Sequence, residues 1–218
     1  MLRESKGNMY EWVTHTWNPI KGKCPHDCSY CYMKRWGEQK LLHLDDSELK
    51  TNLGSGNFIF VGSSTDMFAK EVSSLWIEKV LRKMREYDNS YLLQSKNPNR
   101  FLEYEHLFPK KTVICTTIES NRYYRNIMRM APRPFERAQA MRNINITKYV
   151  TIEPIIDFDI KEMVMFIREC DPVQVNIGAD SGNNHLPEPS KEKLLALIEQ
   201  LGTFTTIANK SNLERILR

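Results

Sequence analysis

Short apolar runs alternate with amphipathic segments along most of the chain. Six runs, rich in β-branched and aromatic residues, predict strands over residues 12–17, 58–62, 91–94, 112–117, 149–153 and 173–177. None shows a strict alternation of apolar and polar positions, which is typical of strands that are covered on both faces. The pattern therefore favours a sheet with helices packed against it.

The segments between these strands predict the helices. In residues 74–87, apolar side chains recur at the three- and four-residue spacing of one helix face. Asn97 and Pro98 are typical of a cap and a first helical position, and they predict a helix over 100–107. Apolar stripes predict two more helices, over 161–169 and 189–201.

Strands that alternate with helices predict a parallel sheet with right-handed crossovers. A full eight-stranded barrel takes about 250 residues, whereas this chain has 218. We therefore expect an α/β fold, a partial (βα)6 TIM-like barrel with a parallel six-stranded sheet, as a single domain over 1–218. Such sheets build their sites at the carboxyl ends of the strands, so polar residues there are the candidates for function.

Composition and the first residues indicate the cellular compartment. Hydrophobic residues make up 41% of the chain, and no apolar run approaches the length of a membrane span. The first six residues lack the apolar stretch of a secretory signal. We therefore expect a protein of the reducing cytoplasm with no membrane partner.

The net charge of +4 is mild, but it is unevenly distributed. Between residues 122 and 142 there is one acid, Glu136, among six arginines: Arg122, Arg125, Arg129, Arg133, Arg137 and Arg142. The first four have helical spacing and predict one basic stripe, which Pro132 and Pro134 are expected to break. A solvated helix face and an anion-binding surface, such as one for nucleic acid, are both open interpretations.

Three cysteines carry the clearest chemical signal. Cys24, Cys28 and Cys31 stand in C-x3-C-x2-C spacing, and no fourth cysteine lies nearby. Three thiolates hold three corners of a [4Fe–4S] cluster and leave the fourth iron open to a ligand. His26 lies among them, so a Cys3His zinc site in a non-catalytic nucleic-acid adaptor is the alternative. Structural zinc sites usually draw their ligands from two separated clusters, and no second pair follows.

This spacing, with an aromatic Tyr30 just before the third cysteine, resembles the signature of the radical S-adenosylmethionine (SAM) superfamily. The resemblance implies a [4Fe–4S] cluster whose open iron binds SAM, and whose electron cleaves SAM to a 5′-deoxyadenosyl radical. It also implies a (βα)6 barrel, and an electron donor such as a flavodoxin or a ferredoxin. The substrate is unidentified; a large molecule, or a pocket completed by a partner protein, is expected because little sequence is left for an extension.

The resemblance also implies SAM contacts at the strand ends. Ser63, Ser64 and Asp66 follow the second strand, where the superfamily binds the SAM amino group. A polar turn capped by Asp66 is the alternative there. Lys96 follows the third strand and is a candidate to neutralise the SAM carboxylate.

Further candidates follow the fourth and fifth strands. Thr117 and Glu119 stand where polar residues of the superfamily bind the ribose hydroxyls. Glu153 ends the fifth strand, where a carboxylate is more often a site residue than a core residue because unpaired buried charge is costly. Tyr30, Ser63, Ser64, Asp66, Lys96, Thr117, Glu119 and Glu153 are thus the predicted cofactor-binding residues.

Two branches of the superfamily share longer stretches with the chain. The T-W-N-P motif at 16–19, with the segments 95–98, 117–119, 152–156 and 178–182, resembles a phage- and mobile-element-associated family. That family has a longer interval between its first two cysteines, and a Gly and a Glu where Ala179 and Asp180 stand here. Spore photoproduct lyase, a DNA-repair enzyme, shares parts of this motif set more distantly.

Spore photoproduct lyase needs a cysteine that returns a hydrogen atom to its product. Cys115 lies near the end of the fourth predicted strand and is the candidate in this chain. The alternative is that Cys115 is a small buried apolar residue of the core.

Overall fold

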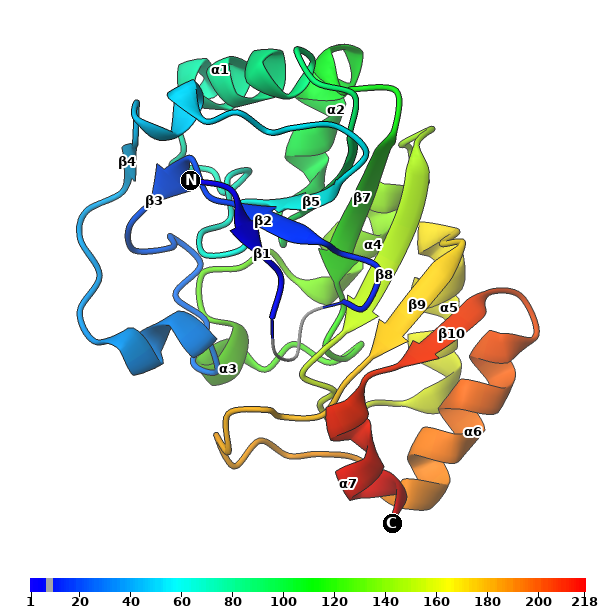
Figure 1. The fold of residues 1–218 in the computed structure, drawn as a ribbon. Coiled ribbons are helices and arrows are strands. Elements are labelled where there is room, and N and C mark those ends of the chain that lie inside the picture. Colours follow the sequence, from blue (N-terminus) through cyan, green and yellow to red (C-terminus); the bar gives the residue numbers. More distant parts are fainter. Residues whose placement is uncertain (7–9) are drawn as a thin grey trace.

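The computed structural model describes residues 1–6 and 10–218 (Figure 1). Its centre is a sheet whose strand order, within the described residues, is β1-β2-β5-β6-β7-β8-β9-β10. The strands are β1 (Arg3–Glu4), β2 (His15–Trp17), β5 (Phe58–Val61), β6 (Ser90–Gln94), β7 (Thr112–Thr117), β8 (Thr147–Ile152), β9 (Gln174–Ile177) and β10 (Thr206–Asn209). All pairs from β2 to β10 are parallel, and β1 pairs with β2 antiparallel.

The α/β class and the parallel order are confirmed, and the sheet has the form of a partial barrel. Each of the six predicted strands is present, and the described chain adds two at the edges. β10 was missed because its residues are polar or partly exposed, and β1 because it is two residues long. An edge strand lacks the apolar run that marks a buried one.

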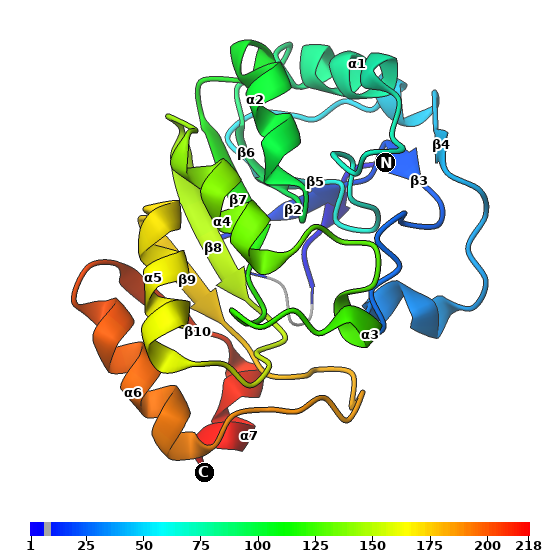
Figure 2. The same cartoon turned by 180° about the vertical axis from the view of Figure 1, so that it is seen from behind.

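Helices cover one face of this sheet, as Figure 2 shows for α2, α4, α5 and α6. The helices are α1 (Ser74–Met84), α2 (Phe101–Tyr104), α3 (Arg125–Met128), α4 (Pro134–Arg142), α5 (Ile160–Cys170), α6 (Lys191–Gly202) and α7 (Glu214–Leu217). Short 3-10 turns are η1 (Tyr32–Trp36), η2 (Glu48–Lys50), η3 (Pro98–Arg100), η4 (Glu105–Leu107) and η5 (Ser211–Leu213). The helix expected over 100–107 is therefore α2 with a 3-10 turn on each side.

Alternate residues of the strands are buried in two separate hydrophobic clusters, one on each face of the sheet. Ile59, Leu93 and Ile114 pack on the helical side, in the larger cluster. Phe60 and Cys115 face the opposite side, with Tyr10, Val13 and Leu92 in a smaller cluster. This two-residue period explains why the strands lack polar alternation, since both faces are buried.

The cysteines lie in a loop that a small ribbon closes at its base. β3 (Ile20–Lys21) and β4 (His43–Leu44) pair antiparallel on either side of it. Gly22 has a φ of 105°, and a Cβ atom there would overlap the carbonyl oxygen of Leu41. Glycine is thus required for the two ends of the loop to meet.

The expected basic stripe is not one helix, and this interpretation was wrong in its geometry. Arg129 has a left-handed φ of 51° and ends α3. Pro134 is the first residue of α4, so this proline begins a helix rather than breaking one.

Within the described residues, no helix is both long and apolar enough to cross a membrane.

The packing under α2 generates a stability prediction. The Phe101 ring is fully buried and lies 4.7 Å, centroid to centroid, from Phe68. Phe101→Ala is expected to lower the free energy of unfolding by about 3–5 kcal/mol. The neighbouring Leu102→Ala removes a side chain that is 38% exposed, and we expect a clearly smaller loss. Urea unfolding of both variants checks this, and equal losses would contradict the assigned core.

Candidate functional site

A cavity of about 770 Å³ opens at the carboxyl ends of the strands. Loops that follow β5 to β10 form one side of it, and the cysteine loop forms the other. Its volume falls in the range of roughly 300–1,000 Å³ that small-molecule and cofactor sites occupy. The position agrees with the rule that parallel sheets bind ligands beyond the carboxyl ends of their strands.

Cys24, Cys28 and Cys31 all line this cavity. The thiol of Cys28 is buried and donates a hydrogen bond to the carbonyl oxygen of Met128 at 3.7 Å. Burial raises the pKa of Cys24 to about 12 and also raises that of Cys28. Burial therefore favours the neutral thiols of Cys24 and Cys28, and a bound metal centre would have to stabilise their thiolates.

The cysteine loop rests on the segment around α3. The amide of Ser29 donates to Ile127 O at 2.9 Å, and the amide of Met130 donates to His26 O at 3.1 Å. These backbone bonds bracket Cys28 and hold it against Met128. Backbone hydrogen bonds on both sides of Cys28 therefore fix the cysteine loop against this segment.

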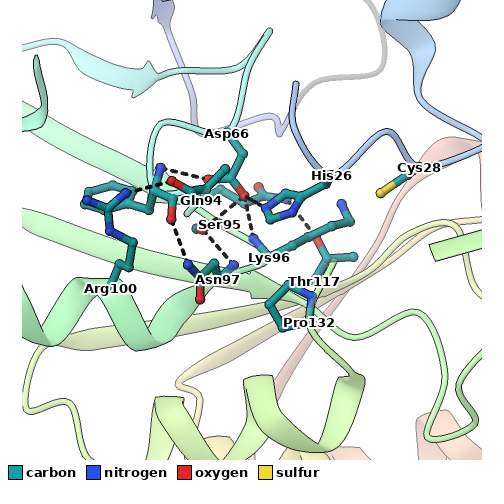
Figure 3. Close-up of polar contacts among 12 residues, drawn as sticks. His26, Cys28, Asp66, Gln94, Ser95, Lys96, Asn97, Arg100, Thr117 and Pro132 are labelled. Atoms are coloured by element: carbon teal, nitrogen blue, oxygen red, sulfur yellow. Dashed lines mark hydrogen bonds and ion pairs between the residues drawn. The ribbon is translucent and has the colours of Figure 1, made fainter. Parts of the chain in front are cut away.

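His26, the fourth ligand of the zinc alternative, is directed toward Asp66 (Figure 3), and its Nε2 lies 2.9 Å from Asp66 Oδ2. Within the described residues, no three His, Cys, Asp or Glu side chains are gathered as a ligand set for a single metal ion. A Cys3His site thus requires His26 to bind through its other ring nitrogen or to leave Asp66.

Asp66 joins the cysteine loop to the loop after β6. Its Oδ2 also accepts hydrogen bonds from Ser95 Oγ at 3.0 Å and from the Lys96 amide at 2.8 Å (Figure 3). Its Oδ1 accepts from the Phe68 amide at 3.0 Å. Burial alone would raise the pKa of Asp66, but His26 and these donors outweigh it and the pKa is lowered. Asp66 lines the cavity, and the protein already uses both of its oxygens.

Lys96 supplies a positive charge beside the cysteines. Burial acts to lower its pKa, but the charge of Glu119, together with that of Cys28 whenever Cys28 is a thiolate, acts in the opposite direction, and the pKa is raised. Its Nζ lies 5.4 Å from the centre of the Tyr30 ring. The ammonium group is therefore charged at neutral pH, and it lines the cavity.

Glu119 lies outside the cavity lining and is fully buried. Its carboxylate accepts a hydrogen bond from Tyr30 OH. It also forms an ion pair with Arg137, whose Nη1 lies 2.6 Å from Glu119 Oε2. Burial acts to raise the pKa of Glu119, but Arg137 and Lys96 outweigh it and lower the pKa. Burial, together with the charge of Glu119, raises the pKa of Tyr30.

Arg137 is the buried cation behind this arrangement. Its Nε donates to Pro132 O at 2.6 Å, and its Nη1 donates to Thr117 O at 2.8 Å as well as to Glu119. It therefore ties α4 to the end of β7 and, through Glu119, to Tyr30 of the cysteine loop. This role could not be predicted from the sequence, because a buried arginine has the same sequence signal as an exposed one.

The remaining arginines of the 122–142 segment have different surroundings. Arg122 pairs with Asp157 and Asp159, and Arg142 pairs with Glu169. Arg129 pairs with Asp27. Within the described residues, Arg125 and Arg133 form no ion pair, so only part of the predicted basic surface is left unpaired.

The other predicted SAM contacts line the cavity with their own partners. Asn18 of the T-W-N-P motif accepts hydrogen bonds from Ser63 Oγ at 3.2 Å and from the Ser64 amide at 2.9 Å. Thr117 accepts from Gln94 Nε2 at 3.2 Å. Glu153 accepts from Lys210 Nζ at 2.6 Å and from Asn212 Nδ2 at 3.0 Å. Their roles toward SAM stay predictions.

Cys115 faces the smaller core and does not line the cavity. Its Sγ lies 3.7 Å from Thr151 Oγ1, and burial raises its pKa to about 12. Thr151 in turn shares a hydrogen bond of 2.5 Å with Tyr10 OH. Cys115 therefore lies one layer below the cavity, and its role as a hydrogen donor stays a prediction.

The cavity lining includes residues that were not singled out from the sequence, among them Tyr10, Gln94, Thr151 and Lys210. Gln94 and Thr151 lie at or near the ends of β6 and β8, so their position was a usable signal. Tyr10 precedes the first predicted strand and Lys210 follows the missed β10. Neither had a strand end to mark it.

Comparison with known protein families shows the family of this chain. The family described as "Protein of unknown function (DUF5131)" matches residues 8–192. The chain belongs to this family. No curated protein sequence matches it.

Solved structures show the same fold. A spore photoproduct lyase variant with bound AdoMet and dinucleoside spore photoproduct is similar, with 12% identity and a TM-score of 0.61 over 92% of this chain. A spore photoproduct lyase complexed with dinucleoside spore photoproduct matches with 12% identity and a TM-score of 0.57 over 91% of this chain. The DUF5131 chain spans 64% of the length of each of these enzymes. At this identity the likeness is one of fold; membership of the phage-associated branch stays a prediction.

The Arg137–Glu119 pair generates a prediction on stability. Removing one partner of a buried ion pair leaves an uncompensated charge, so Arg137→Met and Glu119→Leu should each cost about 3–5 kcal/mol. The double variant should cost clearly less than the sum of both, because no unpaired charge remains. Urea unfolding of the metal-free protein measures this cycle, and additive losses would show that the pair is not coupled. Arg142→Met, at an exposed position of α4, is the matched control.

Proposed function

We propose that the chain is a radical SAM enzyme in which Cys24, Cys28 and Cys31 hold a [4Fe–4S] cluster and the adjoining cavity binds SAM. The observation that carries the proposal is that the three cysteines line one cavity at the carboxyl ends of the parallel strands. The shared fold of an enzyme solved with bound AdoMet supports it. When bound, the cluster supplies the electron that cleaves a C–S bond of SAM to give a 5′-deoxyadenosyl radical.

The residues present fit such a group. Three cysteines leave one iron open, and the cavity beside them has the volume of a cofactor site. Lys96 would compensate the negative charge of the thiolates and attract the SAM carboxylate, since its raised pKa keeps it charged. The Ser63 and Ser64 hydroxyls line the same wall and are suitable acceptors for the SAM ammonium group.

The protein would also control the environment of the reaction. The hydrogen bonds of Asp66 hold the cysteine loop against the loop after β6, which keeps Lys96 near Cys28. The hydrogen bond of Tyr30 to the buried Glu119 would hold the segment between Cys28 and Cys31 in place. We further infer a reducing cytoplasmic setting and an electron donor such as a flavodoxin or a ferredoxin, because an open cluster must be reduced and protected from oxygen.

SAM cleavage tests the proposal. The anaerobically reconstituted protein should form 5′-deoxyadenosine from SAM and a strong reductant, and Cys24→Ala, Cys28→Ala and Cys31→Ala should each abolish it. Cys170→Ala removes a buried thiol of the larger core and should keep the activity. An intact cluster in Cys24→Ala would overturn the ligand assignment, and a colourless protein that takes up zinc would favour the adaptor.

The charge of Lys96 generates a prediction on SAM affinity. Lys96→Met removes the cation while keeping most of the apolar stem, and it should raise the Kd for SAM at least about tenfold, which corresponds to 1.4 kcal/mol. Lys70→Met is the control, because Lys70 is exposed and lies outside the cavity lining. Equilibrium dialysis with the cluster-loaded protein measures both, and an unchanged Kd in Lys96→Met would remove Lys96 from the site.

A further inference from the structure

A strip of cations and aromatic rings lies on the outer side of the cysteine loop. Lys34 Nζ and Arg129 Nη1 lie 2.9 and 2.5 Å from the two carboxylate oxygens of Asp27. Tyr123 OH donates a hydrogen bond to Arg129 O at 3.1 Å. The Arg133 guanidinium lies over the Tyr123 ring at 5.3 Å from its centre. These contacts make the strip continuous from η1, through α3, to the start of α4.

The cations of the strip are Lys34, Arg125, Arg129 and Arg133, and they outnumber the carboxylates beside them. Asp27 is shared by two of its cations, and Glu136 accepts a hydrogen bond from the Arg133 amide. Arg125 is exposed and forms no ion pair with the described part of the chain. Four cations thus face two carboxylates, and the surplus favours an anionic partner.

Planar rings stand exposed along the same strip. Trp36 is 76% exposed, Tyr32 45% and Tyr123 37%, and Met130, just after α3, is 73% exposed. Exposed apolar groups gathered in this way mark interaction surfaces. Rings that alternate with cations fit a partner with both flat groups and charges, which is the chemistry of unpaired bases on a phosphate backbone. An acidic polypeptide would use the cations but not the rings.

The strip continues into the cavity. Tyr32 and Lys34 also line the cavity, and Tyr32 OH donates to Ser63 O of its opposite wall at 2.8 Å. Figures 1 and 2 both show α3 beside the 3-10 turn that follows the cysteines. A strand bound along the strip would therefore pass the cavity mouth.

We propose that the strip binds single-stranded nucleic acid, with bases stacked on Trp36 and Tyr123 and phosphates held by Arg125, Arg129 and Arg133. Delivery of a nucleotide to the cavity rests on the proposed function, whereas binding to the strip does not. Single strands are preferred because their bases are free to stack on exposed rings, whereas paired bases are not.

Fluorescence anisotropy of the cluster-loaded protein with a labelled oligothymidylate tests the strip. Affinity should fall steeply between 50 and 200 mM salt. Arg125→Gln/Arg133→Gln should weaken binding and reduce the salt slope by about 0.7 for each phosphate that the variant no longer neutralises. Trp36→Ala should weaken binding roughly 5- to 150-fold at an unchanged slope. Arg82→Gln, an exposed arginine of α1 far from α3 in Figure 1, should change neither.

Any other result of the binding measurements overturns the proposal. Absence of binding, or an equal loss in Arg82→Gln, would show that the strip is not the site. Equal binding of a duplex would refute the stacking, and equal competition by polyglutamate would assign the strip to acidic polypeptides.

The same preparations are assayed for 5′-deoxyadenosine without nucleic acid. Oligonucleotide binding without SAM cleavage would refute the proposed function but support the binding role of the strip. SAM cleavage without oligonucleotide binding would support the proposed function but refute the role of the strip.

Discussion

The buried charge of Arg137 is the constraint on which the site depends. A cation removed from water needs compensation, and this one obtains it from Glu119 and from two carbonyl oxygens, those of Thr117 and Pro132. Glu119 in turn accepts the hydroxyl of Tyr30, the residue before Cys31. The need to neutralise one arginine therefore joins α4, the end of β7 and the cysteine loop, so the position of the cysteines is coupled to a helix packed on the other face of the sheet.

Asp66 provides the matching constraint from the opposite wall. Its carboxylate binds His26 of the cysteine loop and the backbone of Lys96. The loop is thus held from both sides, by Tyr30 and by His26, with Cys28 between them and buried against Met128. The outer side of the same loop carries Lys34 and Trp36, which leaves the cations and rings of this surface next to the cavity.

The sequence was sufficient for six of the strands, because runs such as 58–62 and 112–117 are rich in β-branched and aromatic residues and are buried on both faces. It was also sufficient for the cavity wall, since Ser63, Lys96, Thr117 and Glu153 follow parallel strands and meet at one edge. It did not reveal that Glu119 is buried, because this depends on an arginine that is 18 positions away and brought close by tertiary packing. It failed for the arginine stripe, because regular spacing does not reveal the positive φ at Arg129 that ends α3.

The central claim is that an open iron of a cluster on Cys24, Cys28 and Cys31 binds SAM. Electron paramagnetic resonance of the reduced, reconstituted protein, recorded with and without SAM, tests this most directly. The account predicts a cluster spectrum that changes when SAM is added, because a ligand to the open iron alters its surroundings. A cluster spectrum that SAM leaves unchanged would contradict the account.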